Sequence, residues 1–182
     1  DRIEHAPGVF DQAKLDWMNG YFIRQLADDD LAARLMPFIE RANLHADPAI
    51  VRGLAPLVKE RMKKLSEIVT LADFLFVDDV EYDPPLLIGK GADAASALAA
   101  LRAALALLEK YPTYADEDAE RIESELRGQA EILGQKNAQF FGTLRVAVTG
   151  KTVSLPLMGS MRLLGAEKTL RRIKRAIIAL GG

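Results

Sequence analysis

The strongest constraint on the fold is a stretch near the C-terminus, residues 140–158, which the sequence divides into helix, turn and helix. Apolar residues recur at helical spacing up to Val148, so one face of the first segment is expected to be buried. Gly150 follows at a position where a helix C-terminus favours a left-handed residue. Ser154 is expected to cap the next helix, with Pro156 in its first turn. The stretch therefore predicts a sharp corner between two helices.

This corner carries chemistry suited to phosphates and unstacked bases. Arg145 and Lys151 place positive charge beside the turn, next to small hydroxyl side chains and free backbone donors. The segment Thr149–Thr152 resembles the end of a phosphate-binding loop, but that loop requires a second glycine where this chain has Arg145. The spacing therefore argues against a nucleotide-hydrolysing loop.

The rest of the chain shows helical spacing too, interrupted by turn signals. We expect an all-α fold with helices at about 11–26, from 28 to before Asn43, 48–76 (a long helix and a second one), 93–111, from the acidic run 114–118 to about 133, 157–164 and 167–180. Asp11 and Asp93 are expected to cap their helices. The segment Asp78–Gly91 contains two adjacent prolines and two glycines, which are turn signals and helix breakers. We therefore predict two consecutive helical-bundle subdomains, 1–80 and 81–182.

Composition limits the class of protein. The 182 residues are 49% hydrophobic and 27% charged, which is ordinary for a soluble globular protein with a real core. Cysteine is absent, no apolar run is long enough to span a bilayer, and the first residues do not resemble a signal peptide. These features predict a cytoplasmic protein. The net charge of −2 argues against indiscriminate nucleic-acid binding, so any RNA contact requires local basic patches.

Several side chains have a structural interpretation beside a functional one. The single tryptophan, Trp17, is expected to anchor packing, because large aromatic residues mainly supply buried area. Basic residues along the helix after residue 48 and along the last helix, which includes Arg172, form either solvated faces or RNA contacts. With only His5 and His45, the chain offers no His-based catalytic triad.

Two separate motifs carry a resemblance to a known family. The first comprises Leu144–Gly150, Ser154–Pro156 and Met161–Gly165, and the second comprises Val9–Gly20 followed by Ile23 and Arg24. In this order, they resemble the C-terminal region of bacterial glutamyl-tRNA synthetase, a class I aminoacyl-tRNA synthetase. The ATP-site signatures of that family, of the His-Ile-Gly-His and Lys-Met-Ser-Lys-Ser types, are absent.

The resemblance implies an anticodon-binding role for five residues. Arg61 is expected to lie on the helix after residue 48 and to read the wobble base, favouring C and so separating tRNA for glutamate from tRNA for glutamine. Arg145 would supply charge and hydrogen bonds, Ser154 would read base edges, and Leu157 would pack on an unstacked base. Lys151 would add positive charge beside them. The family often has proline directly after the Ser154 position, whereas here Leu155 intervenes.

The resemblance also implies what this chain lacks. The parent enzyme would attach glutamate to tRNA(Glu) using ATP with Mg²⁺, whereas this chain would bind no cofactor and no metal and be inactive alone. Its partner would be tRNA(Glu), with no DNA or membrane, and it would be a monomer. The alternative is a helical protein-interaction module without an RNA ligand, which predicts no salt-dependent RNA binding.

Overall fold

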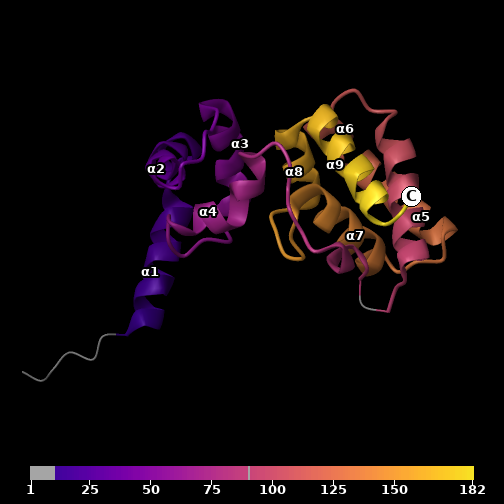
Figure 1. Cartoon of the computed structure of the whole chain (residues 1–182). Helices are drawn as coiled ribbons and strands as arrows, with labels where there is room; N and C mark the ends of the chain where they lie inside the picture. Colours follow the sequence, from indigo (N-terminus) through magenta and orange to yellow (C-terminus); the bar gives the residue numbers. More distant parts are fainter. Residues whose placement is uncertain (1–10, 90) are drawn as a thin grey trace, which may run out of the picture.

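The computed structural model describes residues 11–89 and 91–182, and within these ranges the regular elements are all helical (Figure 1). The predicted all-α fold is confirmed. His5 and residues 1–10 as a whole lie outside the described residues.

The first half of the chain forms a small bundle. It contains α1 (Gln12–Gln25), α2 (Asp28–Arg41), α3 (Pro48–Val58), α4 (Glu67–Ala72) and the short 3₁₀ helix η1 (Asp73–Leu75). Helices α2 and α3 pack against each other, and their core is made of Leu31, Leu35, Ile39, Val51, Leu54 and Val58, none of which is exposed. Helix α1 extends away from this core in Figure 1 and buries only Gly20 and Ile23.

The second half forms a larger bundle on the other side of the molecule (Figure 1). It contains η2 (Pro84–Leu87), α5 (Ala94–Leu108), α6 (Asp116–Ile132), α7 (Asn137–Thr149), α8 (Leu157–Leu164) and α9 (Ala166–Ala179). Helix α5 packs against α6, α7 and α9 around a core that includes Leu101, Leu108, Ile122, Leu126, Phe140 and Leu144. The subdomain boundary between residues 80 and 81 stays a prediction.

Three helix-end predictions are confirmed. The Asp11 carboxylate accepts a hydrogen bond from the backbone N–H of Lys14 at 3.1 Å. Asp93 and Ser96 form a reciprocal capping box at the start of α5, which satisfies two otherwise unpaired backbone donors. Gly150 ends α7 with φ of 73°, and a Cβ there would lie 3.2 Å from the carbonyl oxygen of Glu81. Glycine is therefore required at this corner for both conformation and space.

Other local predictions are wrong. Ser154 does not cap α8, which begins at Leu157 with Pro156 at the capping position and no side-chain cap. The helix expected after residue 48 ends at Val58, so Arg61 lies in a turn and not on a helix. Backbone N–H groups of this turn bond to the Glu67 carboxylate instead, at 2.8 Å from Lys63.

Trp17 is no packing anchor, because its side chain is 64% exposed. It lies on the outer face of α1 and stacks on Tyr21, with 5.9 Å between ring centroids. The helical spacing of apolar residues correctly predicted α1. It could not show that few of the other described residues pack against this helix.

Arg172 on α9 joins the two halves. Its side chain is 1% exposed and donates to the carbonyl oxygens of Val148 at 2.7 Å, Phe74 at 2.8 Å and Val77 at 2.7 Å. The sequence placed this arginine on a solvated or RNA-facing side of the helix, and that interpretation is wrong. Its five donors instead hold the segment between the bundles against α7 and α9.

Candidate nucleic-acid interface

The loop between α7 and α8, residues 150–156, is held from one side by Arg145. This residue lies on α7 at a half-buried position, one turn before the helix ends. Its guanidinium donates to the Ser154 hydroxyl oxygen at 3.1 Å and to the carbonyl oxygen of Leu155 at 2.9 Å. Arg145 therefore fixes the shape of the loop from the helix beneath it.

Arg61 reaches the same loop from the first bundle. Its guanidinium donates to the carbonyl oxygen of Ser154 at 3.3 Å, although 93 positions separate the two residues in the chain. Arg61 itself is exposed. Three residues singled out from the sequence, Arg61, Arg145 and Ser154, are thus brought together by the fold.

The two arginines also interact electrostatically. Burial lowers the pKa of Arg145, and the like charge of Arg61 lowers it further. Among residues 11–89 and 91–182, no ion pair joins either guanidinium to a carboxylate, although thirteen other cations have such partners. Two guanidinium groups without a carboxylate at ion-pairing distance thus contact this loop, an arrangement that favours an anionic or base-edge ligand.

Lys151 lies at the base of the loop and is held by α4 and η1. Its ammonium group contacts the carbonyl oxygen of Thr70 and pairs with the Asp73 carboxylate. Its backbone N–H donates to the Thr149 hydroxyl at 3.2 Å, and that hydroxyl donates to the Arg145 carbonyl at 2.9 Å. Lys151 thus anchors the loop, and its charge is partly compensated.

Leu157 and Val153 differ sharply in exposure. Leu157 is 6% exposed and packs in the core of the second bundle. Val153, at the tip of the same loop, is 79% exposed. Sequence reasoning singled out Leu157 and missed Val153, because a valine within a turn gives no sign of the direction in which it points.

The basic residues of α9 do not form a free patch. Lys168 pairs with Asp78 at 3.4 Å, and Arg175 pairs with Asp79 at 3.0 Å. Burial lowers the pKa of Arg172 to about 10, which still leaves it protonated near neutral pH. This set of cations is compensated by carboxylates and carbonyl oxygens of the segment between the bundles.

The described residues contain no group of three His, Cys, Asp or Glu side chains placed to hold a metal ion. No helix in residues 11–89 or 91–182 is long and apolar enough to span a membrane.

Comparison with known proteins identifies the family of this chain. The sequence profile of the anticodon-binding domain family matches residues 30–177, which include both arginines and the whole loop. The chain belongs to this family.

Full-length relatives carry the same region. Glutamate–tRNA ligase of Dehalococcoides mccartyi is 41% identical over 185 residues, covering 99% of this chain and 37% of the relative. Glutamate–tRNA ligase of Roseiflexus castenholzii is 42% identical over 189 residues, covering 99% and 36%. The chain thus spans just over a third of the length of these relatives. The resemblance to the glutamyl-tRNA synthetase C-terminal region is confirmed.

Solved structures agree on the fold. A crystal structure of a glutamate–tRNA ligase from Elizabethkingia meningosepticum superposes with a TM-score of 0.77 at 19% identity, covering 94% of this chain and 33% of that one. A second, from Elizabethkingia anophelis, has a TM-score of 0.70 at 21% identity and covers 93% and 32%. At such identities the likeness concerns the fold alone.

Proposed function

We propose that this chain recognises the anticodon of tRNA(Glu) as part of a glutamate–tRNA ligase. The observation that supports it best is the convergence of Arg61 and Arg145 on the Ser154–Leu155 turn, without carboxylate partners among the described residues. This site lies within the region matched by the anticodon-binding family.

Both arginines keep donors available for a ligand. A guanidinium has five N–H donors, and Arg61 uses one of them on Ser154 while Arg145 uses one nitrogen on the loop. The remaining donors can pair with a base edge or a phosphate, or the planar group can stack on an unpaired base. Because each guanidinium group bonds to the loop through one of its nitrogens, its remaining N–H donors are held in a fixed position.

Which anticodon base Arg61 contacts has to be tested at all three anticodon positions. Glutamate and glutamine codons differ only in their first base, which pairs with the third anticodon base, while the wobble base is common to both tRNAs. An arginine that separates the two tRNAs must therefore sense the third base. The discrimination predicted for Arg61 therefore requires that its preferred C is the third anticodon base and not the wobble base.

The other predicted residues take supporting roles in this proposal. Lys151 anchors the loop and adds positive potential. Leu157 supports the loop from the core, because a side chain that is 6% exposed offers little surface to a base. Val153, at 79% exposure, offers the apolar surface on which an unstacked base can pack.

The rest of the proposed protein would supply the chemistry. Its catalytic part would bind ATP with Mg²⁺, activate glutamate and transfer it to the tRNA, whereas residues 1–182 alone would not catalyse this reaction. We propose a cytoplasmic monomer with tRNA as its nucleic-acid partner and no DNA or membrane ligand.

The test is binding of this chain to tRNA(Glu) at low salt, alongside three tRNAs that each carry one altered anticodon base. We expect the native tRNA to bind best and Arg61→Ala to remove the preference at one position. Arg52→Ala is the matched control, because Arg52 is an exposed arginine on α3 that pairs with Asp29 at 2.8 Å. It should leave the preference intact.

Two results would reject parts of this proposal. Equal binding of all four tRNAs would leave an RNA-binding surface without anticodon recognition. Absence of salt-dependent binding to any tRNA would favour the protein-interaction module.

A further inference from the structure

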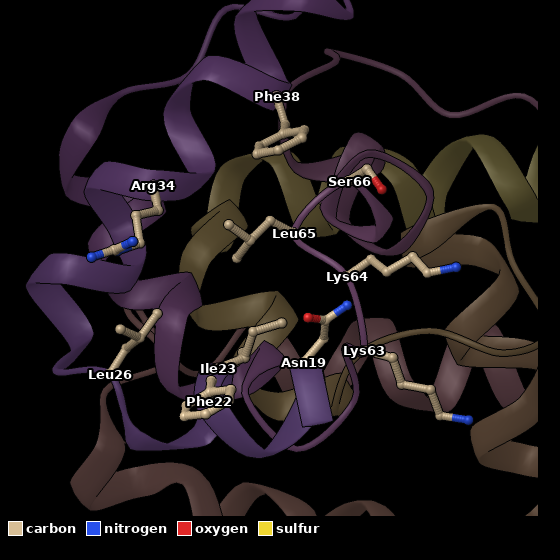
Figure 2. Close-up of a pocket in the computed structure, with 10 residues that line it drawn as sticks. All are labelled: Asn19, Phe22, Ile23, Leu26, Arg34, Phe38, Lys63, Lys64, Leu65 and Ser66. Carbon is tan, nitrogen blue, oxygen red and sulfur yellow. The ribbon is translucent and has the colours of Figure 1, made fainter. Parts of the chain in front are cut away.

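A pocket of about 380 Å³ lies in the first bundle, between α1, α2 and the turn at residues 63–66. Figure 2 shows its walls, which combine apolar and basic side chains: Phe22, Ile23, Leu26, Phe38 and Leu65 with Arg34, Lys63 and Lys64. Asn19 and Ser66 complete it. No carboxylate lines the pocket, which therefore suits a ligand that is both partly apolar and anionic.

The position of the pocket follows from a close crossing of two segments. Gly20 on α1 lies against the turn, where a Cβ would be in ordinary van der Waals contact, 3.5 Å from the Met62 carbonyl oxygen and 3.8 Å from the Lys63 Cα. The Lys64–Asp16 ion pair at 3.2 Å also joins the two segments. The crossing holds the face of α1 that carries Asn19 and Phe22 beside the basic turn.

Polar groups in the pocket remain available to a ligand. Within the described chain, the Lys63 ammonium, the Asn19 amide and the Ser66 hydroxyl have no hydrogen-bond or ion-pair partner. Arg34 pairs with Asp30 at 3.0 Å, and Lys64 pairs with Asp16, whereas the Lys63 ammonium makes no ion pair and attracts the Asp16 carboxylate only from farther away. Phe22 is 60% exposed and, in Figure 2, lies near Ile23 and Leu26, with the Lys63 ammonium on the opposite side of the view.

The turn that carries Lys63 is the one that carries Arg61. Only Met62, which is 1% exposed, separates them in the chain, so one turn places Arg61 at the Ser154 loop and Lys63 at the wall of the pocket.

We infer that the pocket binds one unstacked tRNA nucleotide outside the anticodon triplet, with its base against Phe22 and its phosphate near Lys63. The inference rests on the proposed function. Stacking on an aromatic ring is indifferent to base identity, and the Lys63 contact is to the sugar–phosphate backbone. The pocket therefore adds affinity for tRNA without adding anticodon discrimination.

The test measures tRNA(Glu) binding by the whole chain as a function of salt. Lys63→Ala should lower affinity severalfold and reduce the slope of log affinity against log salt by about 0.7 to 0.9, the change expected for one phosphate contact. Phe22→Leu keeps an apolar side chain but removes the ring, and should weaken binding by about fivefold or more at every salt concentration. Both variants should keep the wild-type preference among the anticodon variants.

The chain offers matched controls. Lys110→Ala removes an exposed lysine in the other bundle, and Ile132→Ala removes an apolar side chain that is 78% exposed. Both should bind tRNA like the wild type. Trp17, the single tryptophan, lies on α1 beside Lys63, and iodide quenching of its fluorescence should decrease when tRNA binds.

The outcomes separate this inference from the proposed function. If Lys63→Ala and Phe22→Leu bind tRNA as tightly as the control variants, and binding still depends on the anticodon, the inference about the pocket is overturned while the proposed function stands. That result would fit a pocket that another part of a longer protein covers. No binding of any tRNA would remove both proposals. Saturable binding of a free nucleoside monophosphate, lost in Phe22→Leu without any change in tRNA affinity, would assign the pocket to a small ligand instead.

Discussion

Two clusters of arginine in this chain contact backbone carbonyl oxygens, yet they differ in what surrounds them. Arg172 is 1% exposed, and its donors are distributed over carbonyl oxygens of Phe74, Val77 and Val148. Asp78 and Asp79 lie beside it and pair with its neighbours on α9. Arg61 and Arg145 contact one loop, repel each other, and have no carboxylate partner in the described parts of the chain.

This difference separates a structural cation, Arg172, from the two cations that we propose for recognition, Arg61 and Arg145. A buried guanidinium stabilises a fold only when its donors are used, because burying an unpaired charge is unfavourable. Arg172 meets that condition within the protein. Arg61 and Arg145 meet it only in part, and the remaining donors suit an RNA ligand. The positive charge of a segment therefore does not show what its cations do. The hydrogen-bond acceptors around each cation do show this.

The largest expected effect comes from Arg172. Arg172→Met should lower the free energy of unfolding by about 3 kcal/mol or more, because several buried carbonyl oxygens lose a charged donor. Urea denaturation followed by circular dichroism measures this change. Arg171→Met is the control, since Arg171 is partly exposed and makes one hydrogen bond of 3.0 Å to the Asp78 carbonyl. Similar losses from both variants would contradict a special structural role for Arg172.

Arg145 should affect binding more than stability. Arg145→Met is expected to weaken tRNA binding by about 2 kcal/mol, roughly thirtyfold, because charged hydrogen bonds to the ligand and to the Ser154–Leu155 turn are lost together. The free energy of unfolding should fall by only about 1 kcal/mol. Titration calorimetry and thermal unfolding on the same protein provide both values. A stability loss as large as that of Arg172→Met would place Arg145 in the structural class.

The two arginines of the site should be coupled. Since burial and the like charge of Arg61 both lower the pKa of Arg145, a double-mutant cycle with Arg61→Ala and Arg145→Met should show a non-additive effect on tRNA binding of about 0.5 to 1 kcal/mol. The same cycle with Arg52→Ala replacing Arg61→Ala should be additive, because Arg52 pairs with Asp29. Additivity in the first cycle would mean that the two guanidinium groups contact separate parts of the tRNA.

Local sequence signals predicted three helix ends correctly, at Asp11, Asp93 and Gly150, but not the start of α8, which Ser154 does not cap. The caps at Asp11 and Asp93 and the left-handed Gly150 depend on contacts within a few residues, so their signatures can be read directly. The all-α class followed from periodicity along the whole chain. The five site residues came from a resemblance, and their roles remain predictions.

The errors concern features that depend on residues distant in the chain. A helical apolar pattern continued from Leu54 to Met62, but the helix ends at Val58. The N–H groups of Arg61 and Met62 then bond to the Val58 carbonyl, and that of Lys63 bonds to the Glu67 carboxylate, while Met62 stays buried. Trp17 was expected inside but is exposed, and Arg172 was expected outside but is buried. Both positions satisfy helical spacing, and only the neighbouring helix or segment decides which side is covered.

The smallest effect is expected where basic residues of α9 pair on the surface. Arg175 pairs with Asp79 at 3.0 Å, and both side chains are about half exposed, so Arg175→Ala should change the free energy of unfolding by less than about 1 kcal/mol. It should also leave the salt dependence of tRNA binding unchanged, because this arginine belongs to the compensated cluster. A salt slope reduced by about 0.7 to 0.9 would show instead that the tRNA backbone displaces Asp79 from Arg175. The division between structural and recognition cations would then not extend to the surface of α9.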